Sequence, residues 1–257
     1  MAAESLSSVQ RALDVLRVLG SGPQGVQGVA SALGREKTQV SRTLKVLAEA
    51  GFVERDPSSL EYRIGWQVFA LAGAAGGERL RQEAPGVLRQ LVQSLREPAY
   101  LTVLSGASAV TVLTERPVRG LQAHEWIGRA TPVNCTSSGR ALLLGLGEDE
   151  VRGLLGDAAQ AGSDGRLPGT EHAPRTLPAL LERLSAERAA GYVLAAEEYE
   201  PGLVAVAAPV RDHRGTVTAA LNVSAPVFRL PPEAVPGVID EVTGAARHLT
   251  AALGGPA

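Results

Sequence analysis

The sequence predicts an α+β protein with two domains, a small helical N-terminal domain and a larger C-terminal domain with an antiparallel sheet. The length of 257 residues suggests two domains rather than one. Three short helical patterns and a hairpin pattern occupy the first 65 residues, and strand pairs separated by helical patterns fill the remainder. With 45% hydrophobic residues, the chain can bury a sizeable core in each domain.

The first two helical patterns are short and amphipathic. One begins at a predicted N-cap, Ser8, and stops at Gly20. Its expected buried stripe comprises Val9, Leu13, Leu16 and Val18/Leu19. A second helix is expected over residues 26–34, built on the apolar residues Val26, Val29, Ala30 and Leu33.

A third, longer helix is expected over residues 35–50, after a tight turn that contains Gly34. Gly51 follows it at a position that favours a positive φ. Two helices joined by such a turn form a helix-turn-helix. The outer face carries the only two lysines of the chain with amide, hydroxyl and guanidinium groups, which suit DNA phosphates and base edges. The apolar residues at i, i+4 and i+7 that would face the core are Val40, Leu44 and Leu47.

A β-hairpin pattern follows the third helix and completes a winged helix-turn-helix. Apolar residues at 52–53 and 62–64 suit two short strands, with Pro57, Ser58 and Ser59 in the turn. A merely solvated helix face is the alternative for an isolated amphipathic helix, but the neighbouring helix and hairpin favour DNA binding. The residues expected to contact DNA are Lys37, Thr38, Gln39, Ser41, Arg42, Lys45, Arg55 and Arg63.

The net charge of −2 does not by itself indicate a DNA-binding protein. Residues 1–73 contain eight Lys/Arg and seven Asp/Glu, hence +1, which leaves −3 for the remainder. A nearly neutral DNA-binding domain must concentrate its positive charge locally. It should also gain affinity by dimerisation, because each phosphate contact adds only a modest, salt-dependent increment.

The domain boundary is expected in a helical region interrupted by Gly76 and Gly77. The pattern over residues 66–75 predicts a linker helix, and the pattern over 78–95 predicts the first helix of the second domain. The expected organisation is a DNA-binding domain over residues 1–65, a linker helix over 66–80 and a C-terminal domain over 81–257.

The C-terminal domain shows strand pairs separated by helices, as in an α+β domain with helices packed on one face of an antiparallel sheet. Strands are expected over residues 99–104, 109–115, 120–128, 204–210 and 217–223. Helices are expected over residues 136–146, 148–156, 176–191 and 232–253.

Several classes of function are excluded by the residues that are rare or scattered. The single cysteine, Cys135, excludes a disulfide framework and a multi-cysteine metal site. Cys135 with His124 as base is a conceivable nucleophile, but no motif supports it, so no enzyme activity, metal or other cofactor is expected. The chain lacks a long apolar run and a signal-peptide core, which predicts a soluble cytoplasmic protein without a membrane partner.

Together these segments resemble the IclR family of bacterial transcriptional regulators over nearly the whole chain. The stretches SVQRALDVLRVL, QVSRTLKVLAEAGFVERD and YRIG correspond in order to the family's DNA-binding module, and TPVNCTSSGRALL resembles a strand-to-helix segment of its second domain. The family pattern near the C-terminus has two departures, Ala195 for Asp/Ser and Arg211 for an aromatic residue or His. The residues that satisfy it are Gly191, Glu198, Ala205, Val206, Ala207, Val210 and Asp212.

The resemblance implies a winged helix-turn-helix joined to a GAF-like domain that binds an effector and mediates oligomerisation. It implies a dimer or a dimer of dimers on a pseudo-palindromic operator, usually as a repressor, with DNA affinity altered by a small organic or aromatic acid. Glu198 is expected to hold a loop over the pocket. The pocket positions implied by the resemblance are Thr131, Ser137, Ser138, Ala195, Leu203, Ala205, Asn222 and Ser224.

The pocket residues suggest a ligand chemistry. Ser137 and Ser138 fall at a predicted helix N-terminus, where free N–H groups favour a carboxylate. Asn222 and Ser224 alternate on one strand, so they share a face and can hydrogen-bond the same ligand. Three alternating residues on the preceding predicted strand could also line the pocket, and an aromatic ligand would then be favoured. The alternative is that Trp126 packs in the core or in a subunit interface. The three alternating residues are Gln122, His124 and Trp126.

Alternatives to a repressor remain at this stage. The chain could act as an activator, or as a small-molecule sensor whose helix-turn-helix mediates protein association. Exposed apolar anchors would be expected on such an association surface, whereas the third helix offers Lys, Thr, Gln and Arg. A hydrolase built on a GAF-like domain would need an activated nucleophile that the sequence does not show.

Overall fold

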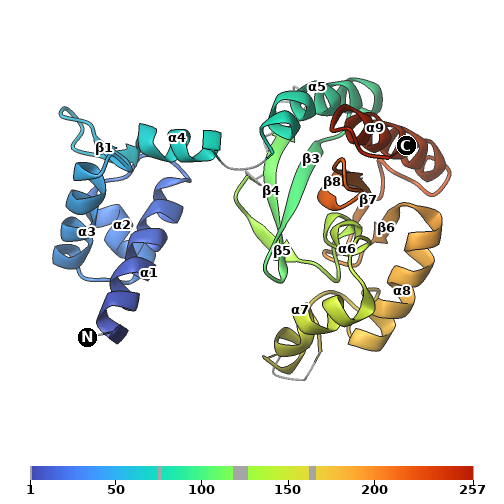
Figure 1. Cartoon of the computed structure of the whole chain (residues 1–257), viewed down its shortest axis with the longest axis horizontal. Helices are drawn as coiled ribbons and strands as arrows, with labels where there is room; N and C mark the ends of the chain where they lie inside the picture. Colours follow the sequence, from blue (N-terminus) through green and yellow to red (C-terminus); the bar gives the residue numbers. More distant parts are fainter. Residues whose placement is uncertain (1, 75–76, 118–126, 162–165, 257) are drawn as a thin grey trace. The chain divides into compact units, whose positions relative to one another are not determined.

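The computed structural model describes residues 2–74, 77–117, 127–161 and 166–256 (Figure 1). The chain divides into two compact units, Met1–Glu78 and Arg79–Ala257. The strand expected over residues 120–128 falls almost entirely outside the described residues. Within the described part of the chain, no helix has the length and apolarity needed to cross a membrane.

The first unit is built on three helices around a small apolar core. The predicted start of the first helix was wrong, because it begins at Ala2 and Ser8 lies inside it. Its predicted buried stripe was partly wrong, since Val9 and Leu13 are 58% and 45% exposed whereas Val15 is fully buried. The helices are α1 (Ala2–Leu19), α2 (Val26–Leu33) and α3 (Lys37–Glu49).

The turn between α2 and α3 and the end of α3 follow the predicted geometry. Gly34 has a φ of 59° at the end of α2, and Gly51 has a φ of 76° just after α3. The predicted stripe of α3 is buried against α1 and α2. Its members are Val40, Leu44 and Leu47.

A short hairpin and a fourth helix complete the first unit. Strand β1 (Val53–Arg55) pairs with β2 (Tyr62–Ile64) in antiparallel register, and Asp56 accepts hydrogen bonds from Ser58 and Ser59 in the turn. These bonds lower the pKa of Asp56 to about 2. Helix α4 (Trp66–Ala74) follows directly after β2.

The second unit is centred on a six-stranded antiparallel sheet with the strand order β5-β4-β3-β8-β7-β6, and its strands are labelled in Figure 1. The predicted pairs are confirmed, with β3 against β4 and β7 against β8. Strand β5 coincides with the start of the strand-to-helix segment that the family resemblance implied, whereas the short strand β6 was not predicted. The strands are β3 (Ala99–Ser105), β4 (Ser108–Glu115), β5 (Ala130–Pro132), β6 (Val193–Ala196), β7 (Leu203–Arg211) and β8 (Val217–Pro226).

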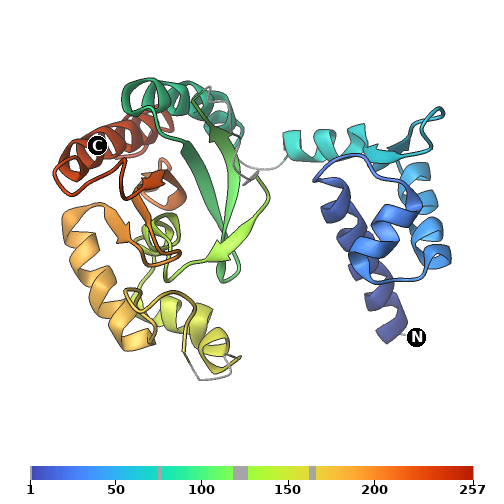
Figure 2. The same ribbon diagram turned by 180° about the vertical axis from the view of Figure 1, so that it is seen from behind.

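Helices cover both faces of this sheet, so the expectation of helices on one face was wrong (Figures 1 and 2). One apolar cluster joins α5 and α9 to alternate residues of β7 and β8, including Val206 and Leu221. A second cluster joins α6, α7 and α8 to the intervening residues Ala207 and Ala220. The helices are α5 (Glu78–Leu95), α6 (Ser137–Leu143), α7 (Glu148–Ala161), α8 (Leu177–Ala190) and α9 (Val235–Ala252).

Candidate DNA-binding surface and ligand cavity

The outer face of α3 exposes every residue predicted to read DNA from that helix. Lys37 and Arg42 have no ion-pair or hydrogen-bond partner among the described residues, so both charges are available to a ligand. Lys45 lies 3.9 Å from Glu49 in an exposed pair, which contributes little and is readily exchanged for a phosphate. The exposed residues are Lys37, Thr38, Gln39, Ser41, Arg42 and Lys45.

The two arginines predicted to contact DNA from the hairpin have protein partners. Arg63 lies directly opposite Glu54 in the register and pairs with it at 2.9 Å. The guanidinium of Arg55 lies 5.5 Å from the ring centroid of Tyr62. The charge of Arg63 is therefore partly neutralised, whereas Lys37 and Arg42 of α3 have no such partner among the described residues.

The second unit contains a cavity of about 70 Å³ between α6 and the adjacent sheet face. A water molecule needs about 10–15 Å³ by this measure, so the space suits a small organic molecule. All eight pocket positions taken from the family resemblance line this cavity. They are Thr131, Ser137, Ser138, Ala195, Leu203, Ala205, Asn222 and Ser224.

The strand register explains why the sheet side of the cavity leaves room for a ligand. Ala195 of β6 lies opposite Ala205 of β7, which in turn lies opposite Ser224 of β8. Because residues opposite one another project to the same face, these three small side chains lie side by side and fill little of the cavity. Tyr100 of β3 lies opposite Asn222 of β8 and adds a polar wall.

Several polar groups face the cavity without a protein partner. Among the described residues, no group hydrogen-bonds with the hydroxyls of Ser137 or Ser138, which are 2% and 7% exposed. The Oδ1 atom of Asn222 accepts a long bond from Thr102 at 3.5 Å, and its Nδ2 has no acceptor in the described part of the protein. Because buried polar groups normally find partners, these three donors mark where a ligand would bind.

Helix α6 places the two serines through its N-terminal turn. Thr136 is the N-cap: its Oγ1 accepts from the Gly139 amide at 3.2 Å and donates to the Pro132 carbonyl at 2.7 Å. The capping role therefore belongs to Thr136, which leaves the Ser137 and Ser138 side chains for the cavity.

Some residues of the cavity were missed in the sequence. Tyr100 and Thr102 alternate on β3, and this period-2 polar pattern on a predicted strand could have identified them. Tyr199 comes from a loop, where no periodicity exists. Gln122, His124 and Trp126, predicted as further lining residues, lie outside the described residues. The additional lining residues are Tyr100, Thr102, Thr111, Cys135, Thr136 and Tyr199.

Cys135 borders the cavity as a buried thiol. Burial raises its pKa to about 11, the opposite of what an activated nucleophile requires. Among the described residues, no group of three or more His, Cys, Asp or Glu side chains could hold a metal ion.

Comparisons with known proteins cover both units. Residues 8–57 match the IclR helix-turn-helix domain, and residues 73–251 match the bacterial transcriptional regulator IclR C-terminal domain. The chain is 30% identical to the transcriptional regulator XynR of Escherichia coli K12, over 98% of this chain and 99% of that protein. It is 34% identical to the glycerol operon regulatory protein of Streptomyces griseus, over 98% and 96% of the two chains.

A solved structure has the same fold over nearly the whole chain. The crystal structure of an IclR transcriptional regulator from Alicyclobacillus acidocaldarius superposes with a TM-score of 0.77 at 25% identity, covering 96% of this chain and 99% of that one. These matches are to regulators of transcription rather than to enzymes. The chain belongs to the IclR family of bacterial transcriptional regulators, with an N-terminal DNA-binding domain and a C-terminal effector-binding domain.

Proposed function

We propose that the protein is a cytoplasmic, ligand-responsive repressor that binds a pseudo-palindromic operator as a dimer or a dimer of dimers. The first unit binds DNA, α4 links it to the second unit, and the cavity binds a small organic acid that changes DNA affinity. Relatives of the chain include a protein named as a transcriptional repressor, which supports this sign of regulation.

The exposed polar face of α3 is the observation that carries the DNA-binding part of the proposal. Lys37 and Arg42 present unpaired cations, and Thr38, Gln39 and Ser41 add hydrogen-bonding groups that can read base edges. Arg55 and Arg63 of the hairpin would contact sugar-phosphate after exchanging their protein partners for phosphate oxygens.

The cavity supports a ligand rich in hydrogen-bond acceptors. Ser137, Ser138 and Asn222 offer donors without protein acceptors, which suits the oxygens of a carboxylate. No charged side chain lines the cavity among the described residues, so these neutral donors would bind the carboxylate without a salt bridge. The aromatic alternative depends on Trp126, His124 and Gln122, and the cavity volume favours a smaller acid.

Two substitutions on α3 test the DNA-binding face. Arg42→Ala is expected to weaken operator binding by about 1–3 kcal/mol if the guanidinium reads a base. Lys45→Ala is expected to reduce the slope of log K against log salt by about 1. Both are measured by gel-shift titration at several salt concentrations, on promoter fragments adjacent to the protein's own gene.

The matched control is Arg247→Ala, because Arg247 is an exposed arginine on α9 in the other unit. This variant should bind DNA like the wild type at every salt concentration. Unchanged binding by both α3 variants would remove this helix from the DNA interface.

A further inference from the structure

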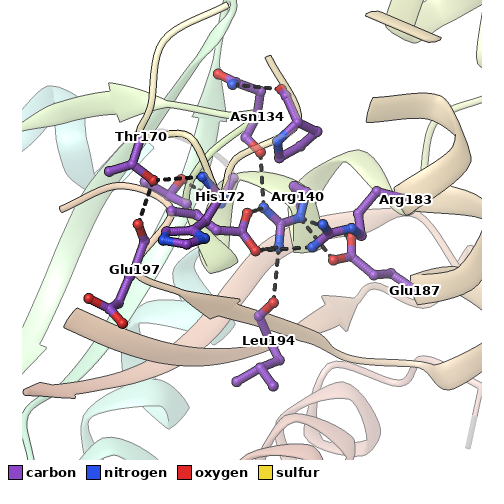
Figure 3. Close-up of polar contacts among 12 residues, drawn as sticks. Asn134, Arg140, Thr170, His172, Arg183, Glu187, Leu194 and Glu197 are labelled. Carbon is purple, nitrogen blue, oxygen red and sulfur yellow. Dashed lines mark hydrogen bonds and ion pairs between the residues drawn. The ribbon is translucent and has the colours of Figure 1, made fainter. Parts of the chain in front are cut away.

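The guanidinium of Arg140 is fully buried, and every one of its N–H groups is hydrogen-bonded (Figure 3). Its Nε donates to Glu187 at 2.9 Å, and Nη1 and Nη2 donate to both carboxylate oxygens of Glu198. The remaining two N–H groups donate to the carbonyls of Asn134 and Leu194 at 3.0 Å each. The bidentate geometry fixes Glu198 in one orientation.

When Glu187 and Glu198 are both ionised, the charges of this cluster balance only if a fourth residue, Arg183, is counted. Arg140 meets two carboxylates, and Arg183, whose side chain is 42% exposed, reaches Glu198 at 3.0 Å. Buried ion pairs are expensive to desolvate, and apolar residues of similar volume often stabilise a fold as well or better. Stability alone is therefore a weak reason for burying Arg140, Glu187 and Glu198 together. Their arrangement suggests that they hold neighbouring parts of the chain in place.

The cluster connects α6 and the loop after β6, which both border the cavity, to α8, which contributes no residue to the cavity lining. Arg140 lies one turn after Ser137 on α6, and Glu187 and Arg183 lie on α8. Glu198 belongs to the loop of residues 197–202 between β6 and β7. Tyr199, next to Glu198, lines the cavity together with Leu203 at the start of β7.

The loop of residues 197–202 depends on a few specific bonds for its shape. Glu197 has a positive φ of 56°, a conformation that costs energy for a residue with a side chain. The Glu197 carboxylate accepts from the Gly202 amide at 2.8 Å, and Thr170 bonds the carbonyls of Glu197 and Glu198. Within the described structure, the Glu198 side chain provides the loop's ion pairs to α6 and α8.

We propose that Arg140 and Glu198 are positioning residues that hold the loop of residues 197–202 as a wall of the cavity. Neither side chain lines the cavity itself. They act through Tyr199 and Leu203, which they keep facing Ser137 and Ser138. This proposal rests on the cavity being the effector site, because only then does the position of the wall affect the response to ligand.

Hydrogen–deuterium exchange in the full-length protein tests the proposal without a ligand. Glu198→Gln keeps the shape of the side chain and removes its charge. The loop amides of residues 197–202 should exchange at least about tenfold faster, since a charge-assisted hydrogen bond to the loop is weakened. The amides paired between β7 and β8 should exchange at the wild-type rate.

Arg188→Ala is the matched control. Arg188 lies on the same helix as Glu187 and donates to the carbonyls of Leu144 and Leu146, away from the loop. It should lower the melting temperature and leave loop exchange unchanged. Wild-type loop exchange in Glu198→Gln, or equal acceleration in Arg188→Ala, overturns the proposal.

A milder variant keeps the test decisive if Glu198→Gln does not fold. Arg183→Ala removes only the half-exposed partner of Glu198 and should accelerate loop exchange at least about twofold. No acceleration in this variant overturns the proposal equally.

A binding measurement extends the test to the ligand, with glycerate and glycerol as a pair that differs by one carboxylate. If either probe raises the melting temperature of the wild type, Glu198→Gln should need at least about a tenfold higher concentration of that probe for the same shift. An unchanged concentration dependence contradicts the positioning role. If neither probe stabilises the wild type, neither is the ligand, and the exchange experiment still decides the role of the loop.

Discussion

Ser138 places a hydroxyl in the cavity that no other described protein group satisfies. Ser138→Leu should fill this end of the cavity and abolish the rise in melting temperature that a panel of small organic acids produces in the wild type. DNA binding without ligand should be unaffected, because Ser138 lies in the other unit.

Ser185→Leu provides the control for this substitution, since Ser185 is an exposed residue of α8. This variant should respond to the acids like the wild type. A normal response by Ser138→Leu would place the ligand elsewhere.

Glu187 gives the second unit a measurable dependence on pH. Burial raises the pKa of Glu187 from 4.5 to about 7, although Arg140 and Arg183 oppose this rise. The folded state therefore keeps a proton that the unfolded chain releases above pH 4.5. The resulting stabilisation is complete at low pH and is lost as the pH rises through about 7.

Glu187→Gln removes this titration. The free energy of unfolding of the wild type minus that of Glu187→Gln should fall as the pH rises from about 5 to about 7 and then level off. Urea unfolding at a series of pH values measures both curves, and the histidines cancel in the difference. A difference that does not vary with pH would show that Glu187 is ionised throughout.

Single residues were predictable where function requires exposure or a recognisable pattern. The polar face of α3 followed from helical periodicity, and the cavity residues followed from the family resemblance. The role of Arg140 was not predictable, because Glu187 and Glu198 are 47 and 58 residues away in the chain. Only the folded topology brings these charges together.

Helix α6 packs unusually close to the segment that precedes it. A Cβ atom on Gly139 would lie 2.6 Å from both the Val133 carbonyl oxygen and Thr136 Oγ1. Gly139→Ala should therefore destabilise the second unit by about 1–3 kcal/mol, because the backbone has to move. Urea unfolding monitored by circular dichroism measures the loss.

Gly153→Ala is the corresponding change at an open position of α7, where a Cβ meets nothing within 4 Å. It should stabilise the protein by about 0.5–1 kcal/mol through helix propensity. Equal stabilities of Gly139→Ala and the wild type would mean that the helix can shift away from Val133.

At the level of elements, the long periodic patterns and the hairpin of β1 and β2 were predicted, whereas a short strand without turn residues beside it was missed. Strand β6 has four residues, too few for an alternation to be recognised. The second helical face of the sheet could have been predicted from residues 203–210, a continuous apolar run. Such a run indicates a strand buried on both faces rather than on one.

At the level of the whole molecule, the proposed dimer follows from how little DNA one unit can read. A single helix-turn-helix covers one half-site, and two half-sites one helical turn apart require a two-fold pair. Apolar side chains left exposed on α1 and α4 could form part of the contact. They are Val9, Leu13, Trp66 and Leu71.

Light scattering measures the oligomeric state of the protein, and a DNA titration measures how many chains bind one operator. The expected result is a dimer or tetramer at micromolar concentration with two chains bound per operator. A stable monomer that binds DNA one-to-one would contradict the proposal. The two-unit organisation was predictable from the sequence, whereas the assembly depends on surfaces that no periodicity identifies.

Alkylation of the single thiol, that of Cys135, can be used to measure how often the structure around the cavity opens. At neutral pH the thiol is protonated as well as shielded, so an alkylating reagent can label it only when the surrounding structure opens. The labelling rate thus measures how often the region next to the cavity opens, and it needs no engineered label because the chain has no other cysteine. Any compound that occupies the cavity would slow this chemistry, whatever its effect on DNA.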